Sequence, residues 1–101
     1  MQTYNKLVRD NMPDRIIAKG EECLFHTATE EEYREKLREK FLEEWQEYLE
    51  NGSSDELADI LEVVEALGLL AGDSFENLVE KKRKKKEERG GFEKKIILEK
   101  S

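Results

Sequence analysis

The stretch that decides the fold is residues 43–59, which read EEWQEYLENGSSDELAD. In its middle, Asn51 and Gly52 favour the end of a helix, and Ser53 favours the start of the next one. Because so few residues connect the two predicted helices, we expect them to pack as an antiparallel hairpin. This hairpin would bring the end of the first helix close to the start of the second.

Apolar residues recur at helical spacing on both sides of this turn. Thr29 is expected to begin the first helix, with Glu32 three residues on as its capping-box partner. The second helix covers about residues 55–70 and is the most apolar element of the chain. A helix with apolar residues around most of its circumference is expected to be buried on most sides.

Shorter elements flank the hairpin. Asp10 is expected to cap a short helix that Gly20 ends, and residues 73–89 are expected to form a fourth helix. Residues 23–27 and 92–98 are interpreted as short strands, and the second could pair with one of the early extended segments of the chain. The sequence therefore predicts a mainly all-α fold of the four-helix hairpin or bundle type, with short N- and C-terminal β-strands.

The composition limits the class of protein. The 101 residues include 18 Lys and Arg against 25 Asp and Glu, which gives a formal net charge of −7. A single Cys excludes an internal disulfide, and the N-terminus does not resemble a signal peptide. The most apolar stretch contains three acids, which argues against a membrane span. We expect one cytoplasmic domain over residues 1–101, with a core so small that help from a second copy is expected.

Four acids of the predicted hairpin occupy unusual positions. Glu44 and Glu47 are three residues apart, as are Glu56 and Asp59. A helical wheel at about 100° per residue places Glu44 and Asp59 inside the apolar stripes of their helices, with the other two acids at the edges. A buried carboxylate is costly unless it is paired or binds a metal, and residues 55–70 contain no Lys or Arg. The four carboxylates are therefore a candidate site for Mg²⁺ or Mn²⁺, which prefer oxygen ligands.

Other interpretations of these acids stay open. Glu56 is also the natural capping-box residue for Ser53, and Glu47 could be a charge at the rim of the apolar stripe. Acid pairs at this spacing also arise by chance in so acidic a chain. On that view the hairpin is a non-catalytic helical interaction module.

Three segments together resemble a known family. They are YNKLVRD at residues 4–10, the EEWQE and ELAD motifs within residues 43–59, and RGGF at residues 89–92. The two acidic motifs resemble the ExxE and ExxD signature of the MazG-like all-alpha nucleoside triphosphate pyrophosphohydrolases. The outer segments are similar to its small single-domain, phosphoribosyl-ATP pyrophosphohydrolase-like branch. The chain departs from many relatives at Asn11 and Met12, where they have Lys and Ile.

The resemblance implies an activity for the four acids. Glu44, Glu47, Glu56 and Asp59 would hold Mg²⁺ and catalyse cleavage of a nucleoside triphosphate to its monophosphate and pyrophosphate, as a house-cleaning reaction. Such chemistry needs a metal-activated water and charge neutralisation rather than a Ser or His nucleophile. The alternative substrate is phosphoribosyl-ATP of histidine biosynthesis. A homodimer or homotetramer is expected.

Residues 81–86 read KKRKKK and concentrate six positive charges. These cations can form a solvated helix end, which they would stabilise through the helix dipole. Nucleic-acid binding is disfavoured because the rest of the chain is strongly acidic. The third interpretation is capture of substrate phosphates, since Lys82, Lys86 and Arg89 continue the apolar face of their helix. The family resemblance favours Lys85 and Arg89 for this role.

Trp45 stands next to Glu44 at the edge of the apolar stripe. The aromatic residues of this helix favour core or dimer contacts over stacking on a nucleotide base. Because of its position beside Glu44, Trp45 is also a candidate wall of the substrate pocket.

Overall fold

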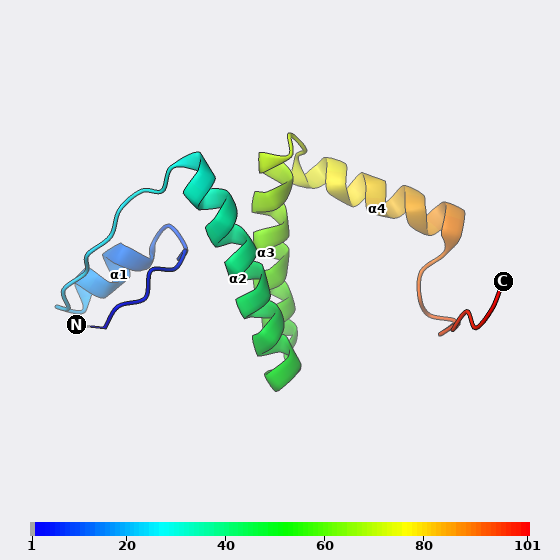
Figure 1. Cartoon of the computed structure of the whole chain (residues 1–101), viewed down its shortest axis with the longest axis horizontal. Helices are drawn as coiled ribbons and strands as arrows, with labels where there is room; N and C mark the ends of the chain where they lie inside the picture. The colour runs from blue at the N-terminus through cyan, green and yellow to red at the C-terminus, as the bar shows by residue number, and fades with distance from the viewer. Residues whose placement is uncertain (1) are drawn as a thin grey trace.

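The computed structural model describes residues 2–101, and this part of the chain forms four helices (Figure 1). They are α1 (Met12–Ala18), α2 (Glu30–Asn51), α3 (Ser54–Leu70) and α4 (Phe75–Arg89). The prediction of a mainly all-α fold is therefore confirmed. Residues 2–101 contain no strand, so both predicted β-strands are wrong.

The two segments predicted as strands lie at opposite ends of the molecule (Figure 1). Residues 23–27 belong to the connection between α1 and α2, whereas residues 92–98 follow α4. In the second segment, the N–H of Lys95 donates to the C=O of Phe92 at 3.0 Å, which makes a turn. Since a strand depends on hydrogen bonds to a neighbouring strand, neither segment can form one alone.

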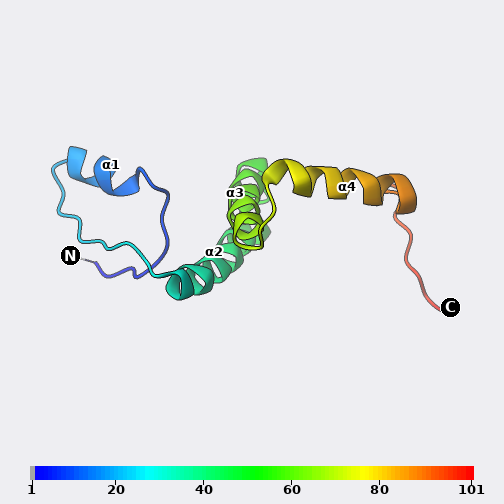
Figure 2. The same ribbon diagram turned by 90° about the horizontal axis from the view of Figure 1, so that it is seen from above.

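The hairpin of α2 and α3 forms as expected. The hydroxyl of Thr29 accepts from the N–H of Glu32 at 3.3 Å and caps the start of α2. Gly52 ends α2 with a left-handed φ of +64°, and its N–H donates to the C=O of Tyr48. The hydroxyl of Ser53 then accepts from the N–H of Asp55 and begins α3. The two helices run antiparallel and lie side by side (Figures 1 and 2).

The apolar core of a single chain is small. Leu37 of α2 and Val63 of α3 are the buried apolar side chains of the described residues. At the far end of α3, Gly68 lets α4 approach closely, because a Cβ there would lie 2.5 Å from Cδ1 of Leu78. From this contact α4 extends away from the hairpin (Figure 1). The core therefore follows the α2–α3 seam and ends at the start of α4.

The expectation that the third helix is buried on most sides is wrong for the single chain. Leu57, Leu61 and Leu69 of α3 are 41%, 54% and 64% exposed. The physical reason is that only α2 covers the length of α3, while α4 contacts one end of it. None of the helices within residues 2–101 combines the length and apolar character needed to cross a membrane.

The N-terminal segment, residues 2–29, lies to one side of the hairpin (Figure 2). Its helix α1 has Pro13 in the first turn and packs against no other helix of the described residues. Asn11, rather than the predicted Asp10, occupies the N-cap position, and its side chain makes no capping hydrogen bond. Gly20 follows the end of α1 with a φ of +81°, as expected for a helix terminator.

Candidate metal centre

The last turns of α2 and the first turns of α3 bring five carboxylates together. We call this group the acidic cluster; it consists of Glu43, Glu44, Glu47, Glu56 and Asp59. One oxygen from each of Glu44, Glu56 and Asp59 lies within 4.8 Å of the others, and the same holds for Glu43, Glu44 and Glu47. Glu44 belongs to both groups, so it lies at the centre. The antiparallel hairpin thus brings together the four carboxylates that the sequence singled out.

Glu44 is the one charged side chain that is buried among residues 2–101, at 6% exposure. Its Oε1 lies 3.2 Å from Nζ of Lys40, one turn earlier on α2. Its Oε2 is buried without any hydrogen-bond partner. An unsatisfied buried oxygen is costly, and a divalent cation is a partner that would satisfy it. The donor set, five carboxylates and no sulfur or imidazole, fits Mg²⁺ or Mn²⁺.

The charges of the cluster repel one another at Glu47. The neighbouring Glu44 carboxylate raises the pKa of Glu47 above its ordinary value of 4.5. Burial acts in the same direction, as do the charges of Glu56 and Glu43. A bound cation would relieve this repulsion, because opposite charge favours the ionised form of an acid.

Glu43 belongs to the cluster although its helical position lies outside the apolar stripe of α2. Its position on the helical wheel points away from the apolar stripe, yet its carboxylate reaches Glu44 and Glu47 because the side chain is long. It also accepts from Nζ of Lys6 at 3.3 Å and lies 3.7 Å from Nζ of Lys40. The pairing with Lys40 could have been found in the sequence from its three-residue spacing.

Asp59 has a cationic partner that the sequence analysis missed. Nη2 of Arg9 donates to its Oδ1 at 2.7 Å, across 50 residues of sequence. Helix α3 itself contains no Lys or Arg, so the cation that pairs with Asp59 comes from a distant segment. No local spacing signals the Arg9 contact, because it depends on the path of the whole N-terminal segment.

Glu56 does not form the predicted capping box. The Ser53 hydroxyl accepts from Asp55, and the Glu56 carboxylate instead accepts from Nδ2 of Asn51 at 3.2 Å. This contact joins the last residue of α2 to the first turn of α3. It leaves the Glu56 side chain within the acidic cluster.

The basic residues predicted to hold phosphate lie elsewhere in the single chain. Lys82, Lys85, Lys86 and Arg89 are exposed on α4, which leaves the end of α3 opposite the acidic cluster (Figure 1). Lys86 lies 3.6 Å from Glu93, and no ion pair within residues 2–101 joins these four cations to the cluster. Within one chain, therefore, the fold does not bring them to the carboxylates.

Trp45 lies on the outside of α2. It is 43% exposed and stacks on Tyr48 of the same helix, with ring centroids 5.6 Å apart. It therefore stands beside the acidic cluster in sequence but contributes little to the core of the single chain.

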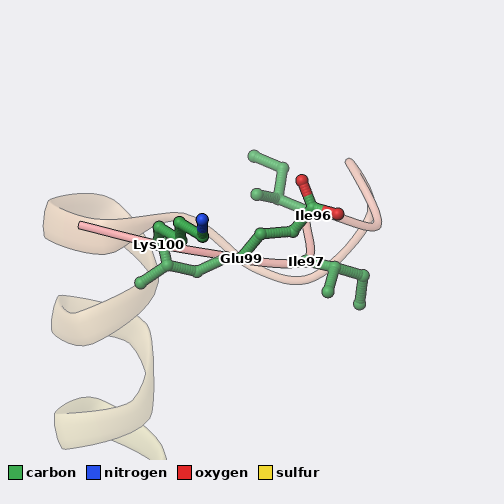
Figure 3. A pocket seen from close by; sticks show the side chains of 5 residues that line it. Ile96, Ile97, Glu99 and Lys100 are labelled. Atoms are coloured by element: carbon green, nitrogen blue, oxygen red, sulfur yellow. The ribbon is translucent and has the colours of Figure 1, made fainter.

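The surface has two hollows that are lined by residues outside the acidic cluster. One, of about 570 Å³, is lined by the consecutive residues Ile96, Ile97, Leu98, Glu99 and Lys100 of the C-terminal segment (Figure 3). The other, of about 180 Å³, lies between the start of α2 and the end of α3, where Arg34 and Arg38 face Leu67 and Leu70. Neither hollow is lined by a residue of the acidic cluster.

The acidic cluster is thus the feature of the described residues whose chemistry most favours a ligand. The α2–α3 hairpin positions its carboxylates, and three cations contact them: Lys6 and Arg9 of the N-terminal segment and Lys40 of α2. No protein-family model, no curated protein and no solved structure matches this chain.

Proposed function

We propose that the protein is a nucleotide pyrophosphohydrolase that depends on Mg²⁺ or Mn²⁺. The observation that carries the proposal is the buried Oε2 of Glu44, which has no hydrogen-bond partner and lies in a cluster of carboxylates from two helices. The resemblance of the acidic motifs to the MazG-like pyrophosphohydrolases supports the same reaction. A nucleoside triphosphate is the proposed substrate, and phosphoribosyl-ATP is the alternative.

The proposed ligands of the cation are Glu44, Glu47, Glu56 and Asp59. When bound, Mg²⁺ would neutralise substrate phosphates and lower the pKa of a coordinated water. Lys40 holds Oε1 of Glu44 at 3.2 Å, so the side chain is oriented before any cation arrives. Asn51 orients Glu56 in a similar way.

In the proposed reaction, a water oxygen forms a bond to the α-phosphorus of the nucleotide. The bond from that phosphorus to the bridging oxygen breaks, and pyrophosphate leaves with this oxygen. One water proton passes to a base. A carboxylate of the acidic cluster is placed to accept this proton.

We further propose that the working protein is a homodimer or homotetramer in the cytoplasm. A monomer of 11.9 kDa would expose about 6,000 Å², whereas this chain exposes 9171 Å². In an oligomer, α4 of a second copy could bring its cations to the acidic cluster. Lys82, Lys85, Lys86 and Arg89 would then contact substrate phosphates, and Trp45 would contribute to the pocket wall.

Pyrophosphate release from a panel of nucleotides with Mg²⁺ tests the activity. We expect release from at least one nucleotide by the wild-type chain and by Glu50→Gln, a control that removes an exposed acid of α2. Asp59→Asn should lower release by on the order of 100-fold or more, because it removes a charged metal ligand. No release from any nucleotide or phosphoribosyl nucleotide would contradict the proposal.

Thermal unfolding separates the enzyme from the second candidate, a non-catalytic interaction module, which the exposed leucines of α3 favour. If the carboxylates bind Mg²⁺, millimolar Mg²⁺ should raise the Tm by linkage. Asp59→Asn should abolish this rise while the helical circular dichroism stays unchanged. A Tm that does not respond to Mg²⁺ in the wild-type chain would favour the interaction module.

A further inference from the structure

Two ion pairs tie residues 2–10 to the hairpin, and both end on the acidic cluster. Lys6 contacts Glu43 at 3.3 Å, and Arg9 contacts Asp59 at 2.7 Å. The helix that follows, α1, packs against no other helix of the described residues. These two ion pairs are therefore contacts that link the segment to the charges of the cluster.

The Arg9 guanidinium is only partly used by its contact with Asp59. A guanidinium has five N–H donors and often binds a carboxylate through two parallel hydrogen bonds. Arg9 makes a single hydrogen bond, from Nη2 to one oxygen, and no other within the described residues. Its side chain is 58% exposed. Its remaining donors are therefore accessible to a ligand at the edge of the cluster.

Arg9 and a divalent cation would compete for Asp59. The cation would take electron pairs from the same carboxylate and compensate its charge, which weakens the attraction of Arg9 to Asp59. The released guanidinium would remain at the edge of the cluster, on the side of Asp59. Its planar fork matches the geometry of phosphate oxygens.

We propose that Arg9 is a substrate-binding residue that changes partners. It pairs with Asp59 in the metal-free protein and binds the pyrophosphate end of the substrate when the cation is present. This inference rests on the proposed function. The pyrophosphate end is the preferred partner because the leaving group gains negative charge as the anhydride bond breaks.

Two binding measurements test this inference without relying on activity. The first measures Mn²⁺ alone, by calorimetry or electron paramagnetic resonance, and the second measures inorganic pyrophosphate in saturating Mn²⁺. The variants are Arg9→Gln, Arg9→Lys and the control Arg15→Gln, which removes an exposed arginine of the same segment. Circular dichroism checks that each variant remains helical.

We expect Arg9→Gln to bind Mn²⁺ about 2- to 5-fold more tightly, because an exposed ion pair no longer opposes the metal. The same variant should bind pyrophosphate on the order of 10- to 100-fold more weakly, since a charge-assisted hydrogen bond is lost. Arg9→Lys should recover part of the pyrophosphate binding, and Arg15→Gln should resemble the wild type.

Three outcomes would overturn the inference. Unchanged pyrophosphate binding by Arg9→Gln would mean that Arg9 does not touch phosphate. Equal losses in Arg9→Gln and Arg15→Gln would mean that any cation of the segment serves. A wild-type chain that binds Mn²⁺ but not pyrophosphate would show that pyrophosphate is not a ligand of Arg9. By contrast, a wild-type chain that binds no Mn²⁺ would overturn the proposed function itself.

Discussion

Glu44 and Glu47 lie one turn apart on α2, and their carboxylates repel each other. In the metal-free protein this repulsion is the largest cause of the raised pKa of Glu47, ahead of its burial. An acid whose pKa is higher in the folded than in the unfolded state binds its proton more tightly when folded. The free energy of unfolding therefore falls as the pH rises from 4.5 through the raised pKa.

Removing the charge of Glu47 should consequently stabilise the metal-free chain. We expect Glu47→Gln in EDTA to have a higher Tm than the wild type at pH 7, with little difference near pH 4. The same substitution should weaken the response of the Tm to Mg²⁺, because a ligand is lost. Thermal unfolding between pH 4 and 8 measures both effects.

Glu50→Gln is the matched control, because Glu50 is an exposed acid on the same helix. Its difference from the wild type should be small and should change little with pH. A Glu47→Gln variant that is less stable than the wild type at pH 7 in EDTA would show that repulsion does not dominate at this site.

The sequence predicts the burial of Glu44 but not the distant cation that contacts Asp59. The helical wheel finds Glu44 because an apolar stripe on one helix determines which positions face its neighbour. The pair of Lys40 with Glu44 is likewise local. Arg9 reaches Asp59 across 50 residues, so its contact depends on a loop path that no periodicity describes.

The ends of the hairpin helices follow directly from residue chemistry. Thr29, Ser53 and Gly52 act through their own hydroxyls or their own backbone freedom, so their effects are readable from sequence. The predicted strands had no such local basis. A strand needs a partner, and residues 23–27 and 92–98 lie too far apart in the structure to pair (Figure 1).

Gly52 provides a test of the turn that positions the acidic cluster. Its φ of +64° is costly for residues with a Cβ, and no atom within 4 Å would obstruct a Cβ there. Gly52→Ala should therefore lower the free energy of unfolding by about 1–2 kcal/mol through backbone strain alone. Urea unfolding measures the loss.

Gly52→Asn is the informative comparison, because Asn adopts the left-handed conformation more readily than Ala. It should lose less stability than Gly52→Ala although its side chain is larger. An Asn variant that is as unstable as the Ala variant, or less stable, would indicate that side-chain volume rather than backbone conformation matters at this turn.

The single chain is extended for its length. Its radius of gyration is 17.7 Å, whereas a compact domain of this length would have about 13 Å. The excess of exposed surface over a typical monomer of this mass is about 3,000 Å² per chain, more than the roughly 1,000–2,500 Å² that each partner contributes to an obligate interface. The acidic cluster and the basic helix α4 also lie apart, which leaves two complementary charged regions on one chain (Figure 1).

The apolar pattern of α3 predicts a buried helix, whereas α3 is partly exposed in the single chain. Such a pattern is typical of a helix whose surface is largely covered, but it does not say by which chain. If a second copy covers Leu61, the prediction was wrong only for the isolated chain. The oligomeric state is therefore the measurement that decides between an exposed and a covered α3.

We expect sedimentation to give at least twice the chain mass of 11.9 kDa, and Leu61→Lys to shift the protein toward monomer. A buried lysine charge at an interface is costly, so the assembly should dissociate at higher concentrations than the wild type. Leu24→Lys is the control, because Leu24 is 89% exposed and lies outside the hairpin. If Leu61→Lys and Leu24→Lys sediment like the wild type, Leu61 lies outside any interface. A wild-type chain that sediments as a monomer would contradict the proposed oligomer.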